Sequence, residues 1–399
     1  MRRTIRKEVA TTMKKSSPRK RSSRNRPPSL VDKFLHYDHS YASGFEKGYH
    51  QGRADGTSGY LKSLEGTSVI IPVCNRKESL MAYVDSKRAD ANHACELIVI
   101  DNGSSDGTAD YLRKSGGKLR YWINSNDIGV VGAINQGLMM ARGQTLSILW
   151  NEAALTSGRL NDSQEQAGEG RTDVADIGED AGTYGLCMPR ETFRRLGYLD
   201  ELFEQPEIAV MDYAVRAFLL NMIPKLPDIA SVSIPHSETD RLYFRSKWGR
   251  RIENVFESGW TPDGRIGDIG AFYPTSVTVK SMGPAVYRLE NNRRYKLESE
   301  GAGISATRLS QLDMKRWPLT TEVSPEHCMD DDDGSLVQTP DGQIYQISQG
   351  KLRPVLSSWV LAMWHLDRQP VMPISLEQKA LYEEGIPLIA PPVIRTGFL

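Results

Sequence analysis

Three stretches of this 399-residue chain combine residue types that could bind a polar ligand. Pro72–Arg76 follows one short apolar run, Asp101–Thr108 follows a second, and residues 127–143 are rich in glycine and other small residues. A carboxylate such as Asp101 can accept hydrogen bonds from a nucleobase imide or from ribose hydroxyls, and small residues let a ligand approach the backbone. The chain contains no GxGxxG and no GxxxxGK[ST], so it carries neither the dinucleotide nor the P-loop fingerprint.

Each stretch also has an explanation that involves no ligand. Asp101 and Ser104 could cap a following helix. Gly129 and Gly137 could serve as turn or packing glycines. The order and spacing of the three stretches, taken together, favour a binding site.

The elements that must position these residues alternate between strands and helices. Short apolar runs predict strands at 69–73, 96–101, 119–123 and 145–150, and the segments between them predict helices at 78–92, 106–114 and 132–141. Such alternation predicts an α/β domain with a mostly parallel sheet covered on both faces. Ligands of open parallel sheets bind beyond the carboxyl ends of the strands, where the first two stretches fall.

At this point the chain resembles the family-2 glycosyltransferases of the GT-A fold. The matching segments are TSVIIPVCNRKESL, ELIVIDNGSSDGTADYL, DIGVVGAINQGLMMARGQTLSILW, YGLCMPRETFRRLGYLDELF, MDYAVRAFLLNMIPKLPDIASVSIPH and YFRSKWG. The resemblance covers residues 67–249 and implies a GT-A-type sheet with flanking helices. It also implies a nucleotide-diphospho-sugar donor, often a UDP-sugar.

Six nucleotide-side positions are implied by this resemblance. Pro72, Asn75 and Asp101 would line the nucleoside pocket. Gly103 would border the pocket, and Asn135 would support it. Asp127 stands where the family usually has Asn.

The metal motif of the family is altered here. At the end of the fourth strand the chain reads Trp150-Asn151-Glu152-Ala153, and Ala153 takes the place of the expected Asp. The remaining candidate ligands for Mg²⁺ or Mn²⁺ are Asn151, Glu152 and His236, in a weakened site.

The catalytic base of the family is altered as well. The usual Glu-Asp pair falls on Ala209 and Val210, while the next family Asp is retained as Asp212, which could also be purely structural. Glu204 and Glu207 lie just upstream and could substitute for the missing base.

Two functions therefore stay open. One is metal-assisted, inverting transfer of a sugar to an unknown glycan or protein acceptor. The other is a catalytically degenerate binding or scaffold protein of the same fold. The intact nucleotide side and the altered base and metal sides predict nucleotide binding with slow or absent turnover.

The N-terminal residues differ from the rest in charge. Residues 1–30 hold eleven Lys or Arg and one acid, which predicts a disordered basic tail that could contact anionic surfaces. Residues 31–66 carry aromatic residues every four positions and suit either a docking segment or a linker. Because no long apolar run occurs and the four cysteines are scattered, we expect a cytoplasmic protein without a transmembrane segment.

The C-terminal part predicts a smaller, β-containing module. Residues 250–279 read as a linker, and 280–399 contain a weak repeat in which residues 285–289 recur as 343–347, 58 positions later. A turn signal and a basic residue follow each copy, which predicts two β-hairpins. The acidic run Asp330–Asp333 between them lacks the spacing of a calcium loop.

Overall fold

The computed structural model of the chain describes most of the part that follows the N-terminal segment. The described residues are 64–89, 95–115, 119–150, 185–223, 238–249, 266–281, 283, 285–290, 292–297, 305–320 and 333–395. The basic tail, most of the aromatic segment and Asp330–Asp332 lie outside these residues, as do Asn151, Glu152 and His236.

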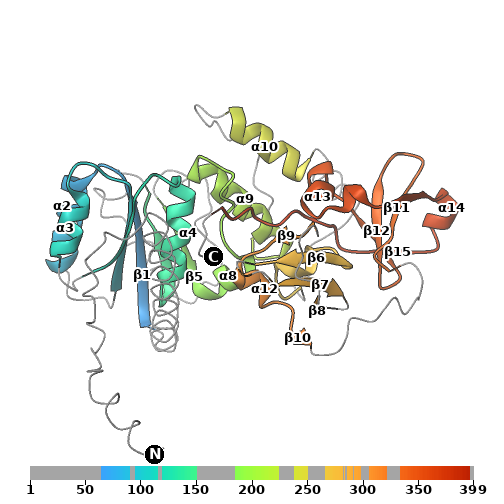
Figure 1. The fold of residues 1–399 in the computed structure, drawn as a ribbon, viewed down its shortest axis with the longest axis horizontal. Helices are drawn as coiled ribbons and strands as arrows, with labels where there is room; N and C mark the ends of the chain where they lie inside the picture. The colour runs from blue at the N-terminus through green and yellow to red at the C-terminus, as the bar shows by residue number, and fades with distance from the viewer. Residues whose placement is uncertain are drawn as a thin grey trace, which may run out of the picture. The chain divides into compact units, whose positions relative to one another are not determined.

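The first sheet contains four parallel strands and one antiparallel strand (Figure 1). Its strands lie in the order β3-β2-β1-β4-β5, with only β5 antiparallel to its neighbour. The bounds are Leu64–Val73 for β1, Cys95–Asn102 for β2, Arg120–Asn124 for β3, Gly143–Ile148 for β4 and Leu186–Pro189 for β5. The mostly parallel α/β sheet expected from the sequence is confirmed.

Both faces of this sheet are buried. Successive residues of β1 point to opposite faces, and each set packs into its own apolar cluster. Ile70 belongs to the apolar cluster that includes Ile134 of α4 (Val130–Met140). Ile71 belongs to a second cluster, formed with α2 (Lys77–Ala89) and α3 (Thr108–Lys114). This two-sided covering explains why β1 reads as a continuous β-branched run instead of an alternating one.

The close packing of α4 on β1 depends on one glycine. A Cβ on Gly137 would lie 2.2 Å from Cγ2 of Ile70, which no side chain could accommodate without movement. The small residues of the third sequence stretch therefore serve, at this position, to bring the helix onto the sheet.

Three described helices follow β5 in the chain. They are α8 (Arg190–Leu196), α9 (Pro206–Leu219) and α10 (Glu238–Trp248). The 3-10 helix η1 (Ile269–Phe272) comes next, within the segment that the sequence assigned to a linker.

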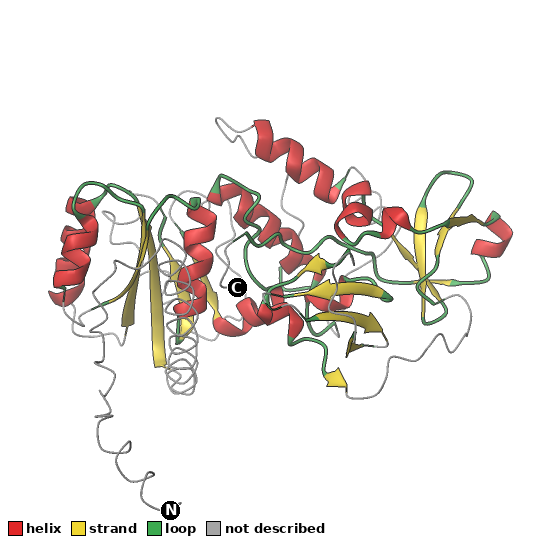
Figure 2. Cartoon of the chain, in the orientation of Figure 1, coloured by secondary structure: helices red, strands yellow, loops and turns green. Residues whose placement is uncertain are grey.

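The C-terminal part holds two further five-stranded sheets, so the β-containing character expected there is confirmed (Figure 2). The strands of the first are β6 (Val277–Lys280), β7 (Val286–Glu290), β8 (Arg293–Lys296), β9 (Thr307–Arg308) and β10 (Leu319–Thr320). Those of the second are β11 (Leu336–Gln338), β12 (Ile344–Ser348), β13 (Lys351–Pro354), β14 (Val371–Pro373) and β15 (Glu383–Glu384). The short helices are α12 (Gln311–Met314), α13 (Ser358–Met363), η2 (Leu366–Arg368) and α14 (Leu376–Lys379).

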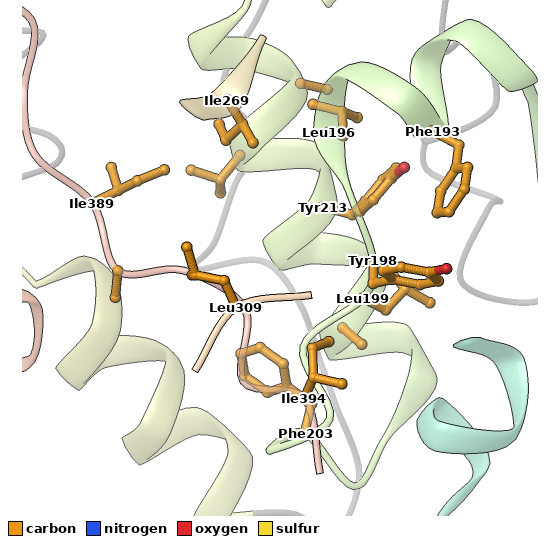
Figure 3. Packing of buried hydrophobic residues seen from close by; sticks show 14 of the residues in the cluster. Phe193, Leu196, Tyr198, Leu199, Phe203, Tyr213, Ile269, Leu309, Ile389 and Ile394 are labelled. Atoms are coloured by element: carbon orange, nitrogen blue, oxygen red, sulfur yellow. The ribbon is translucent and has the colours of Figure 1, made fainter. Parts of the chain in front are cut away.

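The last described residues return to the first part of the chain. Ile389 and Ile394 belong to the same buried cluster as Leu199 and Phe203 (Figure 3). The backbone N–H of Glu201 donates to the carbonyl of Val393 at 2.9 Å. The C-terminal segment is therefore part of the core that supports α8 and α9. None of the described helices has the length and apolar character required to cross a membrane.

Candidate functional site

The carboxyl ends of β1 and β2 lie side by side, because Val73 pairs with Asp101 in the parallel ladder. From β1 the chain order runs through β2 to β3 on one side and resumes with β4 on the other. Such a reversal is where ligands bind in open α/β sheets. The structure thus brings the first two sequence stretches to one edge, as expected.

Asn75 links the loop after β1 to the loop after β2. Its backbone is left-handed, with φ of 54°, and its N–H donates to Oγ of Ser104 at 2.9 Å. Its side-chain oxygen accepts from the N–H of Ser105 at 2.7 Å. Asn tolerates this conformation better than most residues, and its short side chain closes both loops into one rigid edge. Pro72 lies buried in β1, opposite Ile100.

Asp101 has one satisfied and one unsatisfied oxygen. The side chain is fully buried, and its Oδ1 accepts from the N–H of Ser104 at 3.0 Å. Its Oδ2 is buried and has no hydrogen-bond partner among the described residues. A buried polar atom without a partner is unfavourable by about 1–3 kcal/mol, and more when it is charged. This oxygen is the acceptor that a ligand N–H or O–H would satisfy.

Gly103 and Asp127 shape the far side of the edge. Gly103 has φ of +79°, and a Cβ there would lie 2.9 Å from the backbone N of Asp127. Glycine therefore allows the 126–127 loop to approach. The carboxylate of Asp127 accepts from Nδ2 of Asn102 at 2.5 Å and from the N–H of Gly129 at 2.8 Å, so it holds the turn before α4.

Asn135, expected to support the nucleoside pocket, is held by the loop that precedes α9. It is buried on α4, where its side-chain oxygen accepts from the N–H of Leu199 at 3.0 Å. Its Nδ2 donates to the carbonyl of Leu199 and to Oε1 of Glu201, both at 2.9 Å. Both ends of the amide are therefore occupied by the 199–201 loop, and Asn135 can support the edge only indirectly.

Three carboxylates act on the Cys74 thiol at this edge, and the Arg76 guanidinium opposes them. Burial raises the pKa of the Cys74 thiol, and the carboxylates of Asp127, Asp101 and Asp106 raise it further. The pKa of Asp106 is lowered, because hydrogen bonds from Thr108 and from the Lys77 backbone outweigh the opposing effect of burial. The edge therefore combines carboxylates with the cationic side chains of Arg76 and Lys77.

Glu207, in the first turn of α9, contacts a residue just beyond β4. Its Oε1 accepts from Nε1 of Trp150 at 3.0 Å, and Trp150 is the second residue after β4. The side chain of Glu207 is partly exposed at the start of α9. Glu204 is exposed, and its backbone N–H donates to Oδ1 of Asp240 at 3.0 Å. Of the two upstream acids, Glu207 is the one tied to the β4 end of the sheet.

Asp212 is enclosed in a buried network of charges. Its carboxylate lies 2.7 Å from Nζ of Lys247 and 2.9 Å from Nη2 of Arg216, and it accepts from Nε1 of Trp248 at 3.0 Å. Burial favours the neutral acid, but Lys247 and Arg216 hold the pKa of Asp212 below its usual value. This placement matches the structural role that the sequence left open for Asp212.

The same network contains residues that the sequence reasoning passed over. Nζ of Lys247 also lies 2.7 Å from Oδ2 of Asp200, which accepts from the hydroxyl of Tyr243 at 2.7 Å. Lys247 lies in the segment YFRSKWG, whose match to the family could have marked it as a candidate. Ala209 and Val210, which occupy the places of the usual catalytic pair, are buried in the core.

The cation ligands expected from the sequence cannot be placed, since Asn151, Glu152 and His236 lie outside the described residues. Within the described part of the chain, no group of three His, Cys, Asp or Glu side chains is arranged to hold a metal ion.

Residues 68–178 match the family model described as glycosyl transferase family 2. The GalNAc(5)-diNAcBac-PP-undecaprenol beta-1,3-glucosyltransferase of Campylobacter jejuni is 33% identical over 111 residues, which are 27% of this chain and 36% of that protein. An uncharacterized glycosyltransferase of Rickettsia typhi is 33% identical over 82 residues, 21% of this chain and 26% of that one. The chain thus spans about a third or less of the length of these curated relatives.

Solved structures give a weaker likeness. TarS of S. aureus aligns over 37% of this chain and 33% of its own, with 16% sequence identity and a TM-score of 0.31. At a TM-score this low, residues of one protein are not placed on residues of the other.

Proposed function

We propose, from the premise that the chain belongs to glycosyl transferase family 2 through residues 68–178, that its β1–β2 edge binds a nucleotide-diphospho-sugar. The observation that carries this proposal is the unsatisfied Oδ2 of the buried Asp101. The donor we propose is a UDP-sugar. A carboxylate accepts from the N3–H of uracil, whereas cytosine presents no such hydrogen at N3, so Asp101 suits a uracil base or a ribose hydroxyl.

The rigid loops around Asp101 support this assignment. Asn75 ties the two loops together, and Gly103 permits the close approach of the 126–127 loop. An edge fixed before the ligand arrives loses less conformational entropy on binding, which favours affinity. Gly103 would border the nucleoside, with Pro72 and Asn75 beside it.

A diphosphate next to the carboxylates of this edge requires positive charge. Asp101, Asp106 and Asp127 all raise the pKa of Cys74, so their field reaches the end of β1. We assign a bound Mg²⁺ or Mn²⁺ to Asn151, Glu152 and His236. Such a cation, when bound, would neutralise charge on the departing diphosphate.

The acceptor hydroxyl needs a base for inverting transfer, and we assign this role to Glu207. Its carboxylate is partly exposed and is oriented by the indole N–H of Trp150 just beyond β4. Asp212 is less suited to proton transfer, because it is buried and paired with Lys247 and Arg216. Glu204 is the reserve candidate. The acceptor is a hydroxyl of a glycan or a protein.

One observation favours the second candidate, a catalytically degenerate binding or scaffold protein. Ala209 and Val210, at the usual positions of the catalytic carboxylates, are integral to the core. A base supplied by Glu207 would be a replacement for that pair. If Glu207 does not fill this role, nucleotide binding would persist without transfer.

The test is a titration of the full chain with UDP-, GDP- and dTDP-sugars, with and without Mn²⁺, followed calorimetrically and by release of free nucleotide. We expect saturable binding of a UDP-sugar and slow, Mn²⁺-dependent release of UDP. Binding without release would select the degenerate alternative. Failure of every nucleotide to bind would overturn the proposal.

A further inference from the structure

The two C-terminal sheets have the same topology. In each, three consecutive strands form an antiparallel meander, β6-β7-β8 in the first and β11-β12-β13 in the second. A fourth strand pairs in parallel with the first strand of the meander, and a fifth pairs in parallel with the third. The chain thus builds the same five-stranded unit twice (Figure 1).

The registers of the two meanders agree residue by residue at an offset of 58. Tyr287 pairs with Val279 and Lys296, and Tyr345 pairs with Val337 and Pro354. Each meander is preceded by a residue with positive φ, Ser276 at 56° and Gly334 at 93°. The backbone N–H of Ser276 donates to Leu289, and that of Gly334 donates to Ile347, again 58 positions apart.

The second half of each unit also agrees, at an offset of 65. Ser310 caps α12 by accepting from the N–H of Asp313 at 3.0 Å. Ser375 caps α14 by accepting from the N–H of Gln378 at 3.1 Å. We call residues 276–320 the first repeat and residues 334–385 the second repeat. Agreement in strand order, register and helix cap makes the two units structural repeats of one another.

The helical side of the first repeat is covered by the rest of the chain. Leu309, Met314 and Trp317 are buried in the main core cluster. Arg316 forms ion pairs with Asp313 at 2.9 Å and with Asp268, which caps η1, at 3.4 Å.

The edge strand of the first repeat is covered too, since Oγ1 of Thr307 on β9 donates to the carbonyl of Met363 at 2.7 Å. This side of the unit is therefore an interface within the chain.

The same side of the second repeat is uncovered among the described residues. The positions of Leu309, Met314 and Trp317 are taken by Ile374, Lys379 and Tyr382, none of which is fully buried. The position of Arg316 is taken by Leu381, which is 84% exposed.

Exposed apolar side chains are concentrated in the segment from β14 through α14. Of the nine large apolar side chains that are exposed in the described residues, four lie within 371–381: Val371, Met372, Leu376 and Leu381. We call the two in the α14 segment, Leu376 and Leu381, the docking face. Exposed apolar groups gathered in this way mark interaction sites, whereas single exposed ones are ordinary.

The rim of the docking face carries both signs of charge. Glu377, Glu383 and Glu384 are exposed acids. Lys351 lies 2.9 Å from Glu383, and Lys379 donates to the hydroxyl of Tyr345 at 2.7 Å. A rim of one sign would repel its own copy, but a mixed rim around an apolar centre can be complementary to itself about a two-fold axis.

We propose that the docking face binds a second copy of this chain, so that two second repeats pair face to face. In such a dimer the apolar centres cover each other, and the acids of one rim oppose Lys351 and Lys379 of the other. The contact would replace, between two chains, the covering that the first repeat obtains within one chain. It is independent of the sugar-transfer proposal.

The test is the mass of the full chain in solution, measured by sedimentation and light scattering over a concentration series. We expect a reversible dimer in the native protein. The pair of substitutions Leu376→Glu and Leu381→Glu should raise the dimer dissociation constant at least tenfold. A matched control is Leu242→Glu on α10, where a leucine of 59% exposure, close to the 62% of Leu376, lies outside the docking face.

Circular dichroism and the melting temperature establish that each variant is folded. A monomeric native protein would overturn the proposal, whatever other partner the face then binds. A dimer that survives both substitutions on the docking face, or that is lost in the Leu242→Glu control, would overturn it equally.

Discussion

The two ends of strand β2 carry carboxylates with opposite environments. Glu96, near its start, accepts from Oγ of Ser68 and from the N–H of Arg142, both at 2.6 Å, and from Nη1 of Arg120 at 3.1 Å. Asp101, near its end, has one oxygen without a partner among the described residues. The first carboxylate joins the amino ends of neighbouring elements, and the second stands at the edge where sheets of this class bind ligands.

The difference separates structural from functional acids. A carboxylate whose two oxygens both accept hydrogen bonds, such as Glu96, stabilises the fold, and its loss should be visible in unfolding. Asp212 is structural for a different reason: its Oδ2 has no hydrogen bond among the described residues, but the carboxylate is ion-paired with Lys247 and Arg216. Asp101 has a buried oxygen without a hydrogen-bond partner among the described residues, so its burial is unfavourable to the free energy of folding. We therefore expect the loss of Asp101 to be visible in ligand binding. The same comparison distinguishes Asp212 from Glu207 on helix α9.

The largest expected effect is on turnover. Glu207→Gln keeps an acceptor for the Trp150 indole but removes the base, so we expect the turnover number to fall by ~10²–10⁴ with nucleotide affinity unchanged. The measurement is release of free nucleotide from the donor with saturating Mn²⁺. Glu204→Gln is the matched control and should retain turnover; the reverse pattern would move the base to Glu204.

The next effect is on stability. Asp212→Asn leaves Lys247 and Arg216 buried with less compensating charge, so we expect a loss of about 3–5 kcal/mol in the free energy of unfolding. Urea titration measures it, and nucleotide affinity of the folded variant should be unchanged. Unaltered stability would mean that the pairing of Asp212 with Lys247 and Arg216 does not stabilise the fold.

A smaller stability effect is expected at the opposite edge of the sheet. Glu96→Gln weakens hydrogen bonds from Ser68, Arg120 and the Arg142 backbone, and we expect about 1.5–3 kcal/mol of destabilisation. Nucleotide affinity should not change. If the variant instead lost nucleotide binding at full stability, the division between the two ends of β2 would be wrong.

Glu96 also gives a pH dependence. Burial alone would raise its pKa, but hydrogen bonds from Ser68, Arg142 and Arg120 outweigh burial and lower it. Its contribution to stability is therefore complete above the ordinary glutamate pKa of ~4.3 and is lost as the pH falls through the lowered value. Urea midpoints measured from neutral to acidic pH should fall less steeply in Glu96→Gln than in the native protein.

The sequence predicted the features that depend on local pattern. The buried runs of β1, β2 and β4 were visible as apolar stretches, and the position of Asp101 at a strand end followed from them. The turn glycine Gly103 was also visible, because its role depends on backbone conformation.

Long-range contacts were not predictable in the same way. Lys247 meets Asp200 and Asp212 across 47 and 35 positions of the chain, and no local pattern encodes such a pairing. Asn135 was placed near the nucleotide by resemblance, yet its amide is occupied by Leu199 and Glu201. The two-residue strands β9 and β10 are too short to show periodicity, so the full extent of the repeated unit was hidden.

The central claim, that the free oxygen of Asp101 recognises the nucleotide, is tested most directly by calorimetric titration of UDP into the native protein, Asp101→Asn and Glu96→Gln. The asparagine keeps an acceptor for the Ser104 N–H but loses the charge, so we predict at least tenfold weaker binding, about 1.4 kcal/mol, with no loss of stability. Glu96→Gln should bind UDP as the native protein does. Equal UDP affinity in the native protein and Asp101→Asn would contradict the account.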